Sequence, residues 1–277
     1  MHRQEAAIQA DDWPQEKKRG ALSLLWGRRE LVWSLTIRDI RSRYKQSVLG
    51  IAWALVQPVA MTAVFTVFMS MIDRSYAGSI PRPVSIYVGM LPWTFFAGGL
   101  TSGTECLVGN HNLITKIYFP REVFPISAVL GKVVDLALGA LVLLAMLLIF
   151  RIHVTAWALL VIPVLVLQTV FMLGLTLIFS SANLFYRDIR HVMPLVTQMW
   201  MYVSPVVYGL ERVHGKILSV YMLNPMASII GAYRDVVLEG HPPAWNYLGY
   251  SAVVSIVIFL IGYRMFKKLE PLFAETV

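Results

Sequence analysis

Charge and cysteine are both scarce in this sequence. Only 14% of the 277 residues are charged, whereas soluble domains average about 25%. Cys106 is the single cysteine, which excludes an internal disulfide and a cysteine-rich metal site. With 57% hydrophobic residues and a mean hydropathy of +0.63, the composition predicts a polytopic membrane protein.

Catalytic motifs are also missing. The chain contains no G-x-x-x-x-G-K-[ST] phosphate loop and no H-E-x-x-H zinc motif, and its six histidines are dispersed. We therefore predict that this chain is not an enzyme and has no catalytic residues, metal site or cofactor of its own. If the protein moves a solute against a gradient, the energy comes from another subunit or from ion coupling.

Apolar segments recur along most of the chain and predict an all-α integral membrane fold. Residues 21–277 form a single membrane domain in this interpretation, and the polar residues 1–20 form a disordered cytoplasmic tail. A helix crosses a hydrocarbon core of roughly 30 Å at about 1.5 Å per residue. The six predicted transmembrane helices cover about residues 51–72, 84–104, 126–150, 154–183, 192–210 and 244–263.

Two of these predicted spans carry polar or small residues with a defined spacing. Gly99 and Gly103 form a G-x-x-x-G pattern, which allows close helix packing either within the subunit or between two subunits. Lys132 and Asp135 lie three residues apart on one helix face. They predict a local ion pair near the cytoplasmic end of the third span, because a pair costs less in a membrane than either charge alone.

A basic helix is predicted before the first span, over residues 31–46. At about 100° per residue, one narrow face carries Trp33, Ile37, Ile40 and Tyr44, and the basic side chains Arg38, Arg41, Arg43 and Lys45 lie off it. Such an amphipathic helix is typical of the cytoplasmic membrane interface. Leu31 and Leu35 do not fit the stripe, so the first turn has another packing partner.

The segment Asn110–Pro125 is the main polar interruption between two long apolar segments. Asn112 can cap a short helix that carries Leu113, Ile114 and Ile117. A loop with so many apolar residues predicts either an interfacial helix on lipid headgroups or a docking helix for a soluble partner. We favour the docking helix, and we expect the partner to bury its apolar side chains.

A second unusual segment follows the fifth predicted span. Asn224 is a predicted N-cap with Pro225 at the first helical position, and Gly240 provides a stop. The helix between them, Met226–Glu239, is apolar but too short to cross a bilayer. It is predicted to re-enter the outer leaflet or to cover the end of a pathway.

The basic residues are distributed unevenly between the two sides of the membrane. Eighteen of the 24 Lys and Arg residues lie in the N-terminal region, in the loops after spans two and four, and in the C-terminal tail. By the positive-inside rule both termini are cytoplasmic. The net charge of +8 therefore reflects membrane orientation, and we predict no nucleic-acid partner.

Four motifs together resemble one known family. They are R-D-I-R-S-R-Y-K-Q-S-V-L-G-I-A-W-A-L-V-Q-P (Arg38–Pro58), N-L-I-T-K-I-Y-F-P-R-E-V-F-P (Asn112–Pro125), N-L-F-Y-R-D-I (Asn183–Ile189) and N-P-M-A (Asn224–Ala227). The chain resembles the permease subunits of type-2 ABC exporters of cell-surface polysaccharides, a group that includes the O-antigen, teichoic acid and capsule exporters. The resemblance covers nearly the whole chain, in order, outside residues 1–20.

The resemblance implies a bacterial inner-membrane permease that forms a homodimer on two separate ABC ATP-binding subunits, which hold the ATP and Mg²⁺. The implied cargo is a polyprenyl-diphosphate-linked polysaccharide, such as O-antigen. Its coupling helix corresponds to Asn110–Tyr118, with the docking residues Asn110, Asn112, Leu113, Ile114, Lys116, Ile117 and Tyr118. The turn into the first span corresponds to Leu49 and Gly50, and short external gate helices to about residues 214–239, including Asn224, Pro225 and Tyr233.

A sugar path would use aromatic and polar side chains inside the spans. The candidates are Trp53, Gln57, Phe65, Phe68, Trp200, Ser204 and Tyr208. Aromatic residues are equally common in helix packing and at membrane interfaces. Two other functions stay open: an ABC exporter permease for drugs or small lipids, and an integral-membrane enzyme acting on polyprenyl-linked sugars. The enzyme would need acidic or histidine residues gathered at one membrane face.

Overall fold

The computed structural model describes residues 29–45, 50–72, 80–116, 120–210 and 215–273, all of them helical or in short connections. The predictions for residues 1–20 and for Leu49, Ile117 and Tyr118 lie outside the described residues. The elements are α4 (Arg29–Tyr44), η1 (Gly50–Ala52), α5 (Trp53–Ile72), α6 (Arg82–Gly109), α7 (His111–Lys116), α8 (Val123–Ile149), η2 (Ala156–Leu160), α9 (Val161–Phe185), α10 (Ile189–Tyr202), α11 (Lys216–Tyr221), α12 (Pro225–Arg234), η4 (Asp235–Glu239), α13 (Trp245–Leu269) and η5 (Glu270–Leu272).

Five of these helical segments are long and apolar enough to cross a membrane. They are Gly50–Ile72, Arg82–Gly109, Val123–Ile149, Ala156–Phe185 and Trp245–Leu272. They correspond to the first four predicted spans and the sixth. The all-α membrane fold is therefore confirmed, and the second and last of these helices extend several residues beyond their predicted C-terminal ends.

The fifth predicted span is shorter than expected. Helix α10 ends at Tyr202 instead of Leu210 and has 14 residues, or about 21 Å of length. Pro205 disfavours the helical conformation of Ser204. The side-chain amide of Asn224 also donates to the Val203 carbonyl at 3.1 Å and to the Ser204 hydroxyl at 2.8 Å. The turn after α10 is thus stabilised by contacts that a continuing helix would lose, and the crossing by this segment stays a prediction.

Helix α6 is the centre of the bundle, packed against α5, α8, α9, α10 and α12. In its most apolar window 72% of the residues are buried, more than in any other candidate span. A Cβ atom on Gly99 would overlap Met172, and one on Gly103 would overlap Thr176, both on α9. The G-x-x-x-G pattern therefore serves packing within the subunit.

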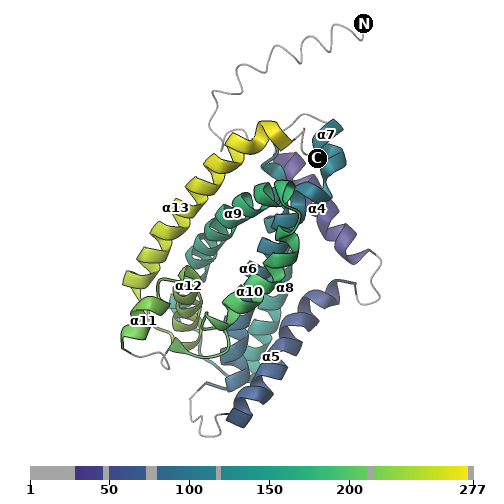
Figure 1. Cartoon of the computed structure of the whole chain (residues 1–277). Coiled ribbons are helices and arrows are strands. Elements are labelled where there is room, and N and C mark those ends of the chain that lie inside the picture. The colour runs from purple at the N-terminus through teal and green to yellow at the C-terminus, as the bar shows by residue number, and fades with distance from the viewer. Residues whose placement is uncertain (1–28, 46–49, 73–79, 117–119, 211–214, 274–277) are drawn as a thin grey trace, which may run out of the picture.

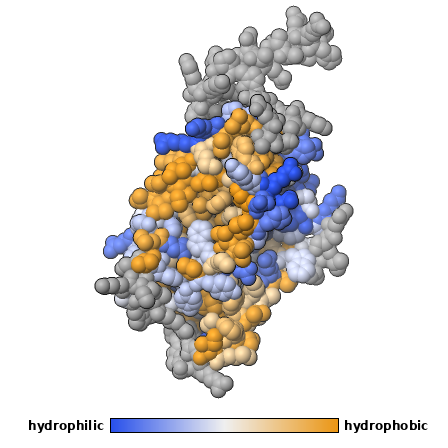
Figure 2. Space-filling model, viewed as in Figure 1, coloured by the Kyte–Doolittle hydropathy of each residue, from blue (hydrophilic) through white to orange (hydrophobic). Residues whose placement is uncertain are grey.

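The helices define two ends of the molecule (Figure 1). One end, the α4 end, carries α4, α7 and the C-terminal end of α13. The opposite end, the α11 end, carries α11, η2 and η4, and η2 contacts η4. Hydrophobic side chains cover much of the face seen in Figure 2. This apolar surface is what a lipid bilayer covers favourably.

Helix α4 forms where the sequence predicts it, two residues earlier at each end, but a different face is buried. Leu35 and Thr36 are buried, whereas Trp33 on the predicted stripe is 65% exposed. Leu35 belongs to a cluster with Leu107, Ile114 and other apolar residues of α6, α7, α8, α9 and α13. Because α4 packs against α8, the protein itself, and not only the lipid interface, determines which residues are buried.

Candidate functional site

Asn110 joins α4, α6 and α7. Its side-chain amide donates to the Cys106 carbonyl at 2.8 Å, and its backbone carbonyl accepts from Leu113 at 2.9 Å. Its side-chain oxygen accepts from the Arg38 guanidinium at 2.5 Å. Asn110 thus connects α4 to the junction between α6 and α7. The predicted capping role of Asn112 is wrong, because Asn112 lies inside α7.

The six-residue helix α7 confirms a short helix in the segment but presents a polar surface. Ile114 is 3% exposed and packs in the same cluster as Leu35. Leu113 is half-buried, whereas His111 and Asn112 are exposed. The expectation that a partner buries Ile114 is therefore wrong, because the chain already buries it. The helical backbone extends through Lys116.

A cluster of charged groups connects α4 to the middle of α8. The Asp135 carboxylate accepts from the Arg43 guanidinium at 2.8 Å and from the Tyr44 hydroxyl at 2.5 Å. The Lys132 ammonium lies 3.3 Å from the same carboxylate. Burial and the adjacent Asp135 raise the pKa of the Tyr44 phenol to about 12. The predicted Lys132–Asp135 pair is confirmed, and Arg43 adds a second cation that the sequence reading did not assign to it.

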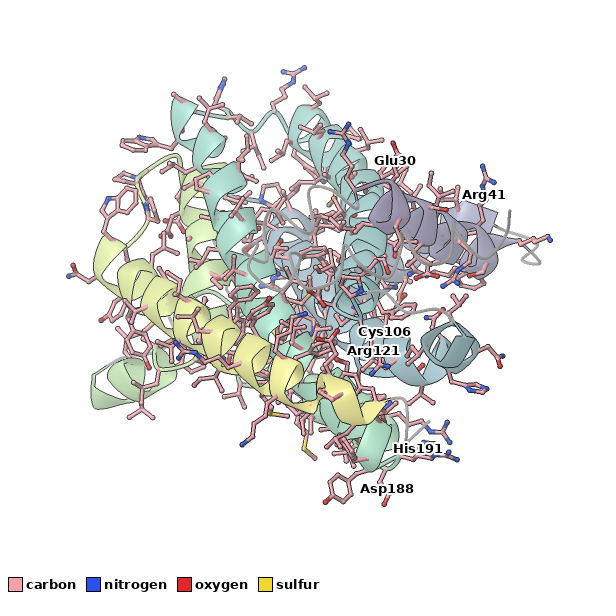
Figure 3. The ribbon with its side chains drawn as sticks, turned by 90° about the horizontal axis from the view of Figure 1, so that it is seen from above. Glu30, Arg41, Cys106, Arg121, Asp188 and His191 are labelled. Atoms are coloured by element: carbon pink, nitrogen blue, oxygen red, sulfur yellow. The ribbon has the colours of Figure 1, made fainter. Side chains whose placement is uncertain are left out.

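A second ionic cluster holds the C-terminal end of α13 against the segment between α7 and α8. The Lys267 ammonium lies 2.8 Å from Glu122 and 3.0 Å from Glu270. The backbone N–H of Arg121 donates to the Glu270 carboxylate at 3.1 Å, and its guanidinium donates to the Glu270 carbonyl. In the view onto the α4 end, Arg121 and Cys106 project close to each other, whereas Asp188 and His191 lie near the edge of the molecule (Figure 3). The residues just before α8 are therefore joined to the C-terminal end of α13 and to η5.

A cavity of about 420 Å³ lies between α5, α6, α8 and α10. Its polar lining comes from Gln57, Thr94, Thr101, Lys132, Asp135, Thr197 and Gln198, and the rest is mainly apolar. The volume falls in the range of about 300–1,000 Å³ that is typical of ligand pockets. The Lys132–Asp135 pair is the charged part of its wall.

Only two of the predicted path residues line this cavity, Gln57 and Phe65. Trp53 and Phe68 on α5 are 51% and 52% exposed and are not among its lining residues. Trp200 in the last turn of α10 also lies outside it, as do Ser204 and Tyr208 after that helix. Gly50 adopts a left-handed φ of 51° at the start of η1, a conformation that glycine accepts readily.

The turn after α10 packs on the N-terminus of α12. The Trp200 indole N–H donates to Asn224 at 2.9 Å, and its ring packs edge-on against Phe96 and Phe171. Asn224 also accepts from the backbone N–H of Met226 at 3.1 Å. Asn224 as N-cap and Pro225 at the first helical position are both confirmed. This helix is enclosed by protein, since all ten of its residues are buried.

Arg234 is a site residue that the sequence reading did not select. It is 5% exposed, and its guanidinium donates to the carbonyls of Val206 and Tyr208. A single arginine among the apolar residues of the short helix could have indicated a buried role. Tyr233 on the same helix donates to the Gln168 side chain at 3.0 Å. The helix α12 therefore fixes both the turn after α10 and helix α9.

A cluster of two carboxylates and one histidine lies at the α11 end. Possible ligand atoms of Asp235, Glu239 and His241 lie within 4.8 Å of one another, and His241 pairs with Glu239 at 2.7 Å. Burial, together with the charge of Glu239, raises the pKa of the Asp235 carboxyl to about 6. Two of the three side chains are exposed, so an ion pair with a third, half-buried carboxyl accounts for the arrangement.

Comparison with known proteins identifies relatives over most of the chain. Residues 30–238 match the family described as "ABC-2 type transporter". A Myxococcus xanthus protein, "O-antigen export system permease protein RfbA", is 29% identical over 257 residues, which cover 91% of this chain and 97% of the relative. A Klebsiella pneumoniae protein of the same name is 27% identical and covers 90% and 95%. The "Polysialic acid transport protein KpsM" of Escherichia coli is 22% identical and covers 86% and 92%.

Proposed function

We propose, from the premise that the chain belongs to the ABC-2 type transporter family, that it is the membrane subunit of a polysaccharide exporter. The observation that carries this proposal is similarity to two O-antigen export permeases along nearly the full length of both chains. The names of these relatives, together with the polysialic acid transporter, favour a polysaccharide over a drug or a small lipid as cargo.

The proposed energy source is ATP hydrolysis by a separate subunit. The sequence has no phosphate loop of its own, which supports this division of labour. We place two ATP-binding subunits beneath a homodimer of this chain, in the bacterial inner membrane. The cargo is a polysaccharide linked to polyprenyl diphosphate, with O-antigen as the first candidate.

The ATP-binding subunit docks at the α4 end in this proposal. Three features support that placement: a short helix lies between two long ones, its exposed face is polar at His111 and Asn112, and the preceding residue, Asn110, is hydrogen-bonded to Arg38 of α4. A push on α7 would reach the bundle through Ile114, which packs in one cluster with residues of α4, α6 and α8.

The docking proposal is tested by co-purification of this chain with its candidate ATP-binding subunit. Asn112→Arg changes the exposed face of α7, and Asn246→Arg makes the same change at an exposed position of the opposite end. We expect Asn112→Arg to lose the subunit and its stimulated ATP hydrolysis, and Asn246→Arg to keep both. Equal retention by the two variants would place docking elsewhere, and ATP hydrolysis by the chain alone would refute the division of labour.

The orientation is tested by labelling from outside the cell. In a Cys106→Ser background, a cysteine in place of Asn246 should react with a membrane-impermeant maleimide, and one in place of Asn112 should not. Both positions are exposed, so accessibility alone does not decide the outcome. The reverse pattern would invert the proposed topology.

A further inference from the structure

The charged cluster on the cavity wall contains two cations and one carboxylate. Asp135 already accepts from Arg43 and Tyr44 at 2.8 and 2.5 Å, while Lys132 lies farther away, at 3.3 Å. A local ion pair needs only one cation for one carboxylate. The cluster therefore keeps a net positive charge in the interior of α8. An uncompensated charge there is costly, and where proteins keep one it usually marks a ligand site or a pathway.

The positive charge faces the cavity. Lys132 and Asp135 line it, whereas Arg43 does not. The stem of Lys132 lies along Gly98 of α6, where an added Cβ would be 3.4 Å from the Lys132 Cε atom. The lysine side chain is thus held between α6 and α8 with only 17% of its surface exposed, and its ammonium is part of the cavity wall.

The remaining lining suits a polar group attached to an apolar chain. Gln57, Thr101 and Gln198 contribute amide and hydroxyl groups to the lining of the same cavity. Gln57 and Gln198 are also exposed, so the cavity opens to the surface between α5 and α10. The neighbouring surface of these helices is apolar, with Leu195 and Met199 exposed at 53% and 61%.

We propose that this cavity binds the phosphate-bearing head of a lipid, with Lys132 as the cation that contacts the phosphate. A phosphate accepts charge-assisted hydrogen bonds from an ammonium group, and the hydrocarbon chain of the same lipid stays outside, against α5 and α10. The inference rests on the proposed function, in which the cargo carries a diphosphate, and it assigns that group to a particular side chain. Arg43 and Tyr44 act as positioning residues: Arg43 neutralises Asp135, Tyr44 donates a hydrogen bond to it, and Lys132 stays available.

The test measures lipid binding to the purified complex of this chain with its ATP-binding subunit by native mass spectrometry. The probes are undecaprenyl diphosphate, undecaprenol, which lacks phosphate, and dioleoylphosphatidylglycerol. We expect Lys132→Met to weaken undecaprenyl diphosphate binding at least tenfold and to leave undecaprenol unchanged. Lys132→Arg keeps the charge and should stay within a few-fold of the parent. Lys268→Met removes an exposed lysine outside the cavity and is the matched control.

A second variant protects the test against misfolding at position 132. Gln198→Glu introduces an anion of the same size at an exposed position of the cavity rim, where folding is not at stake. It should weaken undecaprenyl diphosphate binding several-fold and spare undecaprenol. If Gln198→Glu and a folded Lys132→Met both bind undecaprenyl diphosphate as the parent does, the inference is refuted.

The different lipid probes identify which lipid supplies the phosphate. The co-purified ATP-binding subunit separately tests the proposed function. Phosphatidylglycerol binding with the same Lys132 dependence supports the phosphate site but assigns it to bulk lipid. Loss of the ATP-binding subunit from the unmodified chain refutes the proposed function, whatever the lipids do. A complex that hydrolyses ATP but binds undecaprenyl diphosphate independently of Lys132 refutes only the present inference.

Discussion

The helix pair α9–α13 and the helix α5 show two opposite ways of joining a bundle. A Cβ atom on Gly262 would overlap the Gly174 carbonyl, and one on Gly174 would lie 2.7 Å from the Phe259 backbone. The α9 and α13 backbones are therefore in direct contact. Helix α5 instead has the cavity of about 420 Å³ on one side and an apolar groove of about 480 Å³ on the other.

The difference indicates which part of the bundle is free to change position. In α5 only Pro58 and Thr62 are buried, so few contacts oppose its displacement. Close packing like that of α9 and α13 resists displacement, because moving one backbone requires moving the other. We interpret α9 and α13, with α6, as the rigid part, and α5 as the helix that can move against it.

The largest expected effect comes from filling the contact between α9 and α13. Gly262→Leu forces the two backbones apart, and overpacking of this kind costs at least about 1–3 kcal/mol. We expect severe loss of folded protein in fluorescence size-exclusion chromatography. Gly249→Leu on the same helix, where an added Cβ meets nothing within 4 Å, and Ala63→Leu beside the α5 groove should keep their yield. A normal yield for Gly262→Leu would show that the α9–α13 contact is no more restrictive than the surroundings of α5.

The next largest effect is expected from filling the cavity beside α5, which should reduce export without reducing stability. Ala54 lines the cavity, so Ala54→Trp fills space there without entering a close backbone contact. We expect the thermal midpoint to change little and surface polysaccharide, measured by immunoblot, to fall strongly. Ala63→Trp, on the other side of the same helix, is the matched control and should retain export. Equal loss in both variants would indicate that bulk anywhere on α5 is harmful.

A smaller effect is expected at the link between α4 and α8. Asp135→Asn leaves Arg43 and Lys132 without their shared counter-charge, and breaking a buried pair costs about 3–5 kcal/mol. Because these side chains are 17–27% exposed, we expect a cost of about 2 kcal/mol. Arg43→Gln leaves a matched Lys132–Asp135 pair and should lower the thermal midpoint less. The opposite order would mean that Arg43 alone maintains the link.

The smallest effect concerns pH at the α11 end, where η4 leads into α13. Folding raises the pKa of Asp235 from 3.8 to about 6, so the folded state binds the proton more tightly and stability falls as the pH rises from about 4 to 6. Asp235→Asn should remove this slope and gain on the order of 1 kcal/mol at pH 7, since the partial exposure of Asp235 limits the effect. Thermal scans at pH 4.5 and 7 measure it. Parallel pH profiles would contradict the assignment.

The sequence predicted the fold where one property was sufficient. Apolar length located four spans and the last one, and the Asn224-Pro225 cap located α12. It failed at the end of α10, because that end depends on Asn224, which lies 20 residues after Ser204 and binds its hydroxyl. Pro205 is a local signal for this end, but the stabilising contact with Asn224 cannot be read from the local sequence.

The candidate site was predictable only in part for the same reason. The spacing of Lys132 and Asp135 revealed one ion pair, but the contact with Arg43 joins residues 92 positions apart. Periodicity placed Trp33 on the apolar stripe of α4 and indicated a different packing partner for Leu35, which is confirmed, but it could not identify that partner as the cluster around Leu107 and Ile114. The burial of Ile114 follows from the same cluster, which exists only after α4, α6, α7 and α8 have assembled.

The buried Arg234 has a consequence for the order in which the protein is made. At ten residues, α12 is shorter than the roughly 17–25 that the translocon inserts as a span, and an arginine adds about 2.5–3.5 kcal/mol to insertion. We therefore expect α12 to pack into the bundle only after the helices around it have inserted. One of these helices is α13, the last long helix to be synthesised. Chains that stop before Trp245 lack α13 and therefore leave one side of α12, the helix that carries the buried Arg234, without its packing partner.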